Sequence, residues 1–211
     1  MNKRQHIKKA LLPMAVFFLA VLVAVFAMNA PYIWARIKFA ASTPDQKAVL
    51  KSISLTEIVD ASKGAWQPNT LAIPSLGVTA PIQYATQKDE KHFQELLKSG
   101  VVHYPGTALP GKVGNMFIFG HSSDYAWSSG SYKTVLALLP KLKIGSEIKV
   151  VDKDGYIYTY IAKKIQVAAP TEIQWLSQDT GGKRLLTVQT SYPIGTALKR
   201  YLVIAELRQS D

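Results

Sequence analysis

The most informative segment of the chain is Arg184–Arg200, RLLTVQTSYPIGTALKR, and its counterpart is Asn115–His121, NMFIFGH. Each segment holds an apolar run of the kind that forms a buried strand, and each run ends on a side chain capable of chemistry. The first run ends at Ser191, with Arg200 nine residues later, and the second ends at His121. If the two strands are neighbours, a hydroxyl, an imidazole and a guanidinium meet at the rim of a sheet. There they can act together on one substrate carbonyl.

Strand and turn patterns continue on both sides of these segments. The patterns predict strands over Thr70–Ile73, Val78–Ile82, Asn115–Gly120, Glu147–Asp152, Tyr156–Val167, Arg184–Thr190 and Tyr201–Leu207. Short helices are expected over Asp89–Lys98 and Tyr132–Leu139, and loops over His103–Gly111 and Pro170–Gly182. About eight strands, mostly in hairpin order, predict a mainly β domain built as a closed antiparallel eight-stranded barrel with a few short helices.

The N-terminus has the pattern of a membrane anchor. Met1–Lys9 carries four basic residues, and the twenty residues Leu11–Ala30 carry no charge. Twenty residues of helix span about 30 Å, the thickness of the hydrocarbon core of a bilayer. The basic flank is expected to stay in the cytoplasm. A cleaved signal peptide is the alternative, with a cleavage site at Val25-Phe26-Ala27, but its apolar core is usually only about 7–15 residues long.

These patterns divide the chain into four parts. We expect a cytoplasmic basic tail over residues 1–10, a transmembrane anchor over 11–31, an extracytoplasmic linker with room for a short helix over 32–68, and the barrel domain over 69–211. The protein would then be a single-pass protein of the cell membrane, with its folded domain outside the cytoplasm.

Composition excludes several classes of function. The net charge of +11 suggests nucleic acid, but residues 1–38 hold six basic residues and no acidic one. The remaining 19 basic and 14 acidic residues leave a net charge of +5, without a basic cluster interleaved with stacking aromatics. The absence of cysteine rules out disulfides and thiolate metal sites. His92, His103 and His121 do not show metal-ligand spacing, so no metal is expected. No other cofactor is expected.

Two segments resemble the signature segments of the sortase family. They are GVVHYPGTALPGKVGNMFIFGH, residues Gly100–His121, and LLTVQTSYPIGTALKRYLVIA, residues Leu185–Ala205. In sortases the first strand ends in Gly-His, and the second segment runs roughly Thr-Leu-x-Thr-Cys with an Arg after a short loop. The resemblance covers about residues 69–207. The short spacing from Ser191 to Arg200 is most similar to the housekeeping-type and pilus-type branches.

The resemblance implies a membrane-anchored transpeptidase. Such an enzyme cleaves a C-terminal sorting motif of exported proteins, typically of the Leu-Pro-x-Thr-Gly kind. It then passes the acyl group to an amine of the cell wall or of a pilin. His121 would occupy the acid/base position, Arg200 the position that stabilises the oxyanion, and Ser191 the position of the nucleophile. Thr190, next to the nucleophile, is a candidate for substrate binding. Pro170, Ile173 and Trp175 are candidates for a peptide groove, although a plain core role suits Trp175 equally well.

Serine at position 191 departs from the family pattern, which has cysteine there. A serine hydroxyl is far less acidic than a thiol, so it needs a neutral base in contact with it and a third group that orients the base. His121 is the expected base, and Asp124 is the nearest carboxylate in sequence. Three interpretations follow: an introduced inactivating replacement, a natural degenerate site in a membrane-tethered peptide-binding domain, or a working serine hydrolase or transferase.

Overall fold

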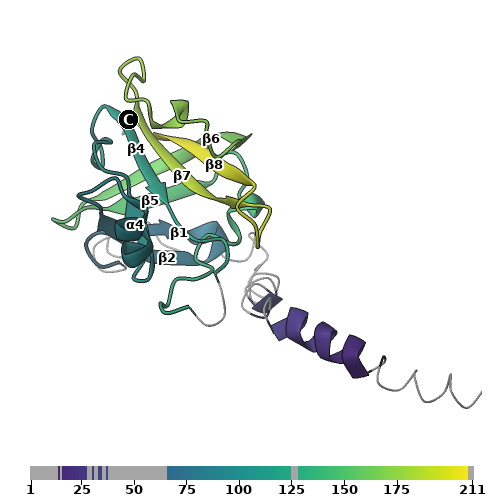
Figure 1. The fold of residues 1–211 in the computed structure, drawn as a ribbon. Helices are drawn as coiled ribbons and strands as arrows, with labels where there is room; N and C mark the ends of the chain where they lie inside the picture. The colour runs from purple at the N-terminus through teal and green to yellow at the C-terminus, as the bar shows by residue number, and fades with distance from the viewer. Residues whose placement is uncertain are drawn as a thin grey trace, which may run out of the picture.

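The computed structural model describes residues 66–124 and 128–208, together with residues 14, 16–27, 30, 33, 34 and 37. In these residues eight strands close into a barrel in the order β1-β2-β3-β4-β7-β8-β6-β5, and β5 pairs back onto β1 (Figure 1). The strands are β1 Thr70–Ile73, β2 Val78–Tyr84, β3 Val101–His103, β4 Gly114–Phe119, β5 Glu147–Val151, β6 Ile157–Ala168, β7 Arg184–Tyr192 and β8 Lys199–Leu207. The prediction of a closed eight-stranded barrel is confirmed.

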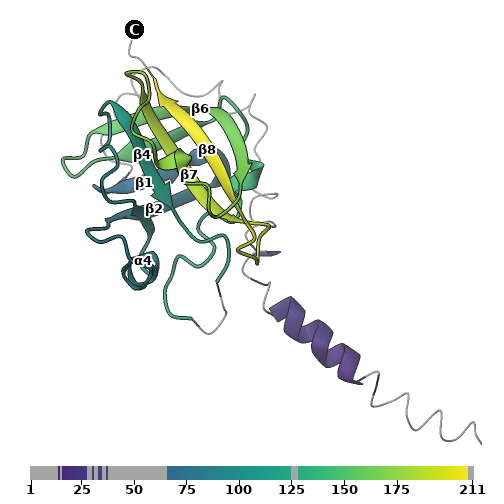
Figure 2. The same cartoon turned by 45° about the horizontal axis from the view of Figure 1, so that its top comes forward.

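The barrel is mixed, so the expectation of an antiparallel barrel is wrong. β2 pairs with β3 in parallel, and β4 pairs with β7 in parallel. A parallel pair needs a crossover connection. Between β2 and β3 that crossover contains the helix α4, Glu90–Leu97, and between β4 and β7 it contains the β5–β6 hairpin. Figure 2 shows β4, β7 and β8 side by side on one wall of the barrel.

Local sequence fixes both ends of α4. Asp89 caps its N-terminus, because its carboxylate accepts a hydrogen bond of 2.9 Å from the backbone N–H of His92. Gly100 follows the helix at a point where a Cβ atom would lie 2.1 Å from the carbonyl oxygen of Pro81. Only glycine allows this close approach, which lets the chain enter β3 beside β2. The predicted helix is therefore confirmed, and β3 is an additional strand that the sequence pattern did not indicate.

The helix predicted over Tyr132–Leu139 is wrong. The segment is a series of turns followed by a short 3₁₀ helix, η2, at Leu139–Lys141. Two similar 3₁₀ helices lie at Pro74–Leu76 (η1) and Gln174–Leu176 (η3). The backbone N–H of Leu136 donates to the carbonyl of His121 at 2.9 Å, so this donor is not available for an α-helix. Tertiary pairing with the segment after β4 overrides the local helical pattern.

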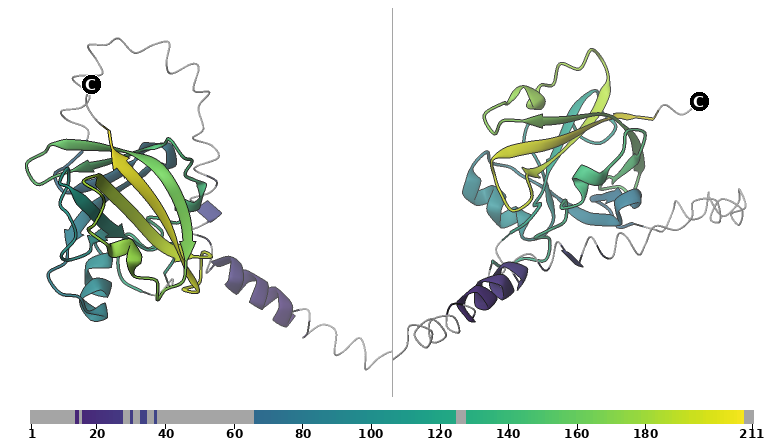
Figure 3. Two further views of the ribbon diagram at one scale, coloured as in Figure 1. Left: turned by 90° about the horizontal axis from the view of Figure 1, so that it is seen from above. Right: turned by 90° about the vertical axis from the view of Figure 1, so that its right-hand side faces the viewer.

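The two faces of the barrel wall bury different clusters. In β7, Leu186 and Val188 face the interior and join the large core that also contains Met116 and Ile118 of β4. Alternate residues of the same strands point outward. A second cluster therefore forms on the outer face, made by Phe117, Ala168 and Leu202 with the partly buried Tyr104, Phe119, Trp175, Leu176 and Ile204. Figure 3 shows the yellow β8 beside the green β6, which continues this wall.

Part of the predicted N-terminal anchor lies in the described residues. Residues 16–27 form an α-helix whose large apolar side chains are exposed, with Phe17 exposed to 64% and Leu22 to 68%. Within the described residues, no helix is both long and apolar enough to cross a membrane. The predicted tail, residues 1–10, and residues 38–65 of the predicted linker lie outside the described residues, as do several residues of the predicted anchor.

Candidate active site

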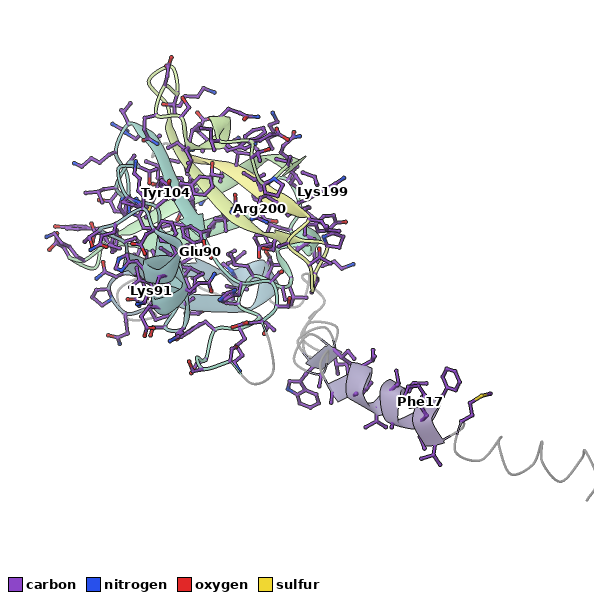
Figure 4. All side chains as sticks on the ribbon, viewed as in Figure 1. Phe17, Glu90, Lys91, Tyr104, Lys199 and Arg200 are labelled. Atoms are coloured by element: carbon purple, nitrogen blue, oxygen red, sulfur yellow. The ribbon has the colours of Figure 1, made fainter. Side chains whose placement is uncertain are left out.

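A cleft of about 310 Å³ lies on the outer face of the wall formed by β4, β7 and β8. Residues of the helix α4 and of the connection between β6 and β7 also line this cleft. The lining residues come from segments far apart in the chain: Glu90, Phe93, Gln94, Leu97, Tyr104, Phe117, Phe119, Gly120, His121, Pro170, Glu172, Ile173, Trp175, Leu176, Gln189, Thr190, Ser191 and Arg200. Figure 4 labels three of them, Glu90 on α4, Tyr104 after β3 and Arg200 on β8.

Parallel pairing brings His121 next to Ser191. Phe119 of β4 is the register partner of Gln189 of β7, and Gly120 donates its N–H to the carbonyl of Gln189 at 3.1 Å. The hydroxyl of Thr190 in turn donates to the carbonyl of Gly120 at 2.8 Å. Continuing this register by two places sets His121 beside Ser191. Because parallel strands end at the same edge of a sheet, the two side chains enter one cleft.

Antiparallel pairing brings Arg200 opposite Ser191. The two residues are direct partners across β7 and β8, and both line the cleft. Directly paired residues project to the same face of a sheet, so the guanidinium and the hydroxyl share the outer face. Nη1 of Arg200 donates to the carbonyls of Ala197 and Lys199 at 3.1 and 3.2 Å, which holds the side chain at the start of β8.

His121 sits in a partly buried, electrostatically mixed setting. Its side chain is 18% exposed, and Nε2 lies 4.0 Å from Oδ2 of Asp124. Burial lowers the pKa of His121 below 6.5, and the negative charges of Asp124 and Glu90 oppose that shift without cancelling it. The imidazole is therefore neutral at pH 7, the form that can accept a proton from a hydroxyl.

The structure brings all seven residues predicted for catalysis or substrate binding to this cleft, whereas Asp124 is not among the residues that line it. His121, Ser191, Arg200, Thr190, Pro170, Ile173 and Trp175 all line it. Thr190 is buried and uses its hydroxyl to bond Gly120, which ties β7 to the end of β4. Trp175 packs in the outer apolar cluster, and Asn115 donates to its carbonyl at 2.7 Å. Ile173 is exposed at the mouth of the cleft.

Sequence reasoning did not identify several other residues that line the cleft. Glu90, Phe93 and Gln94 reach it from α4, while Tyr104, Phe117, Phe119 and Glu172 reach it from other segments. Phe93 makes an edge contact with Phe119 at 5.1 Å between ring centroids and packs on Tyr104 at 5.6 Å. The alternation of Phe117 and Phe119 with core residues was the available signal, since it places two aromatic rings on one face of a strand.

His103, at the end of β3, has a structural role. It is only 4% exposed, and its Nε2 lies 2.9 Å from the carbonyl oxygen of Ala108 and 3.0 Å from the hydroxyl of Thr107. The contact with Ala108 requires a hydrogen on Nε2, because the carbonyl oxygen can only accept. His103 therefore braces the loop that follows β3.

The stability of the fold should depend on His103 at mildly acidic pH. Burial lowers the pKa of His103 below 6.5, so the unfolded chain binds this proton more readily than the folded chain. The free energy of unfolding should be constant above pH 6.5 and fall below it, by about 1.4 kcal/mol for each unit of pKa difference. Urea unfolding of the native chain and of His103→Gln, at about pH 7.5 and about pH 5.5, measures this slope.

The His103→Gln variant should show a weaker pH dependence than the native chain. Some dependence should remain, because burial lowers the pKa of His121 as well. The matched control is His92→Gln on α4, in which the free energy of unfolding should depend on pH as it does in the native chain. If this pH dependence were equal in the native chain and in His103→Gln, His103 would not be the titrating group.

Comparison with known proteins matches residues 71–208 to a family model, the Sortase domain. The lid mutant of sortase A from Corynebacterium diphtheriae is 25% identical, with a TM-score of 0.56 over 72% of this chain and 76% of that one. Sortase C-1 from Actinomyces oris is 25% identical, with a TM-score of 0.56 over 75% and 82%. Sortase C2 of Group B Streptococcus Pilus Island 1 is 26% identical, with a TM-score of 0.56 over 66% and 73%. No curated protein sequence matches the chain. The match to the family model spans more than half of the chain, and the chain therefore belongs to the sortase family.

Proposed function

We propose that this protein is a transpeptidase that uses Ser191 as its nucleophile. It would cleave a sorting motif of exported proteins and transfer the acyl group to an amine of the cell wall or of a pilin. The observation that carries the proposal is the convergence of Ser191, His121 and Arg200 on one cleft of a sortase barrel. Similarity to a sortase A and to a sortase C2 of a pilus island supports the choice of substrate.

The proposed reaction has two steps. In the first, Oγ of Ser191 attacks the scissile carbonyl carbon while His121 takes the hydroxyl proton, and Arg200 stabilises the negative oxygen. The C–N bond breaks, His121 gives the proton to the leaving amine, and an ester on Ser191 remains. In the second, the acceptor amine attacks the ester, its proton passes through His121 to Oγ, and a new amide leaves the site.

The protonation state of His121 supports serine chemistry. A thiolate–imidazolium pair needs a protonated ring, whereas a serine hydroxyl needs a neutral one. Burial lowers the pKa of His121, which keeps the ring neutral at pH 7. The burial of His121 therefore suits general-base activation of a hydroxyl.

We also propose that the N-terminal segment anchors the enzyme in the membrane, with the barrel outside the cytoplasm. The helix over residues 16–27 exposes apolar side chains along its length, among them Phe17 and Leu22. A helix that is apolar all round requires an apolar environment. The uncharged run Leu11–Ala30 and its basic flank Met1–Lys9 fit a lipid environment with the flank on the cytoplasmic side.

The test uses the full chain in detergent with a fluorogenic sorting-motif peptide and an amine acceptor. The native chain should cleave the substrate peptide and form the new amide with the acceptor. A serine-directed fluorophosphonate should label Ser191 of the protein. Ser191→Ala should lose both properties, and mass spectrometry locates the adduct. A native chain that gives neither turnover nor adduct, while Ser191→Cys gives turnover, would mark a peptide-binding protein that has lost its chemistry.

A further inference from the structure

The segment that follows His121 carries a carboxylate next to the imidazole. Oδ2 of Asp124 lies 4.0 Å from Nε2 of His121, and both side chains are largely shielded from solvent, at 21% and 18% exposure. At this distance the negative charge of Asp124 raises the pKa of His121, although burial, the larger effect, lowers it. A shift of about 1 Å would turn the contact into a hydrogen bond, and catalytic hydrogen bonds are often longer before substrate binds.

Several contacts hold this carboxylate in place. The hydroxyl of Ser128 donates to Oδ2 of Asp124 at 2.6 Å. The neighbouring Ser123 accepts a hydrogen bond of 3.0 Å from the backbone N–H of Gly195, in the turn between β7 and β8. Because β7 carries Ser191, this bond ties the Asp124 segment to the strand of the nucleophile. These two bonds hold the Asp124 carboxylate and join its segment to the turn that follows Ser191.

The side of the ring that faces Asp124 determines which nitrogen can act as the base. A carboxylate next to Nε2 favours the neutral tautomer with its proton on Nε2, which leaves the lone pair on Nδ1. As Ser191 loses its proton, the ring becomes an imidazolium beside the Asp124 carboxylate. That charge pair stabilises the transition state without transfer of a proton to the carboxylate.

We propose that Asp124 is a positioning residue that orients His121 and stabilises its protonated form, so that the site works as a Ser191–His121–Asp124 relay. This inference rests on the proposed function, because the relay matters most to an oxygen nucleophile. A thiol is far more acidic than a hydroxyl, so it gives its proton to His121 more readily and depends less on a carboxylate that stabilises the protonated ring. The dependence on Asp124 should therefore differ between Ser191 and a cysteine in its place.

The first measurement is made on the resting enzyme and does not depend on turnover. NMR titration of His121 in the full chain should show a lower pKa in Asp124→Asn than in the native chain, since Asp124 raises this pKa. Glu90 on α4 also raises it and Arg200 on β8 lines the same cleft; both are unchanged in the variant. The ¹⁵N shifts should also report an Nε2–H tautomer in the native chain that is less populated in the variant.

The second measurement compares two nucleophiles. Asp124→Asn should lower kcat about tenfold or more in the Ser191 chain, and by less than about twofold in the Ser191→Cys chain. Asp154→Asn, in the exposed β5–β6 turn, is the matched control and should change neither chain. Thermal melting of each variant checks that it is folded.

The outcomes separate the two proposals. An unchanged pKa of His121 in Asp124→Asn, or an equal loss of kcat with both nucleophiles, would overturn the role of Asp124. A native chain without turnover or phosphonate adduct, but with the expected change in the titration of His121, would overturn the serine transpeptidase and leave the Asp124–His121 pairing standing.

Discussion

Replacing His121 by glutamine should lower kcat for acyl transfer by about 10²–10⁴-fold, the usual contribution of a general acid–base group. Glutamine preserves much of the volume and polarity of the side chain but takes up no proton near neutral pH. The backbone carbonyl of His121, which accepts from Leu136, is unaffected by the substitution. The loss should therefore appear in kcat, with the fold intact, and stopped assays with the fluorogenic peptide measure it.

The pH profile provides an independent sign of the same role. The base must be neutral to accept the proton of Ser191, so activity should be at its plateau above pH 6.5 and fall as His121 becomes protonated below it. Because burial lowers the pKa of His121, the acid limb should lie below 6.5. In His121→Gln this limb should disappear from what activity remains.

His92→Gln is the matched control, because it makes the same chemical change on α4 outside the residues that line the cleft. It should retain native kcat and the native pH profile. A His121→Gln variant with more than about a tenth of the native kcat would contradict general-base catalysis by this residue.

The barrel was predictable because its strands carry strong local signals. The turn Lys153-Asp154-Gly155 joins two long strands, and Gly155 there has a φ of 87°, which suits glycine. The helix α4 was predictable from its apolar face and from the glycine that follows it. The three-residue strand Val101–His103 was not, because so short a run before a loop rich in proline and glycine has no period to detect.

The parallel pairs and the position of the cleft could not be read from local patterns. Strand pairing depends on where the connections return the chain, and those connections include α4 and the β5–β6 hairpin. Nearly every residue of β4 is apolar and buried, so alternation places Phe117 and Phe119 on one face of the strand without showing that this face borders a cleft. Glu90 reaches the cleft only because α4 packs beside it, which is a tertiary effect.

Replacing Arg200 by glutamine should lower kcat by about 10²–10³-fold, the usual effect of removing one donor that stabilises an oxyanion. Arg200 pairs directly with Ser191 across β7 and β8, so its guanidinium shares the outer face and the cleft with the nucleophile. Lysine keeps the charge but loses the planar fork of donors, so Arg200→Lys should recover only part of the activity. Steady-state kinetics with the fluorogenic peptide should place the loss in kcat.

Lys199 offers a demanding control because it is the neighbouring cation on the same strand (Figure 4). It pairs with Tyr192, is exposed, and does not line the cleft, so Lys199→Gln removes a charge of the same sign one residue away. If the general positive field at the start of β8 were the important factor, the two glutamine variants would lose similar activity. If a donor must face the oxyanion, only Arg200→Gln should lose it. Equal losses in the two variants would therefore reject the oxyanion role of Arg200.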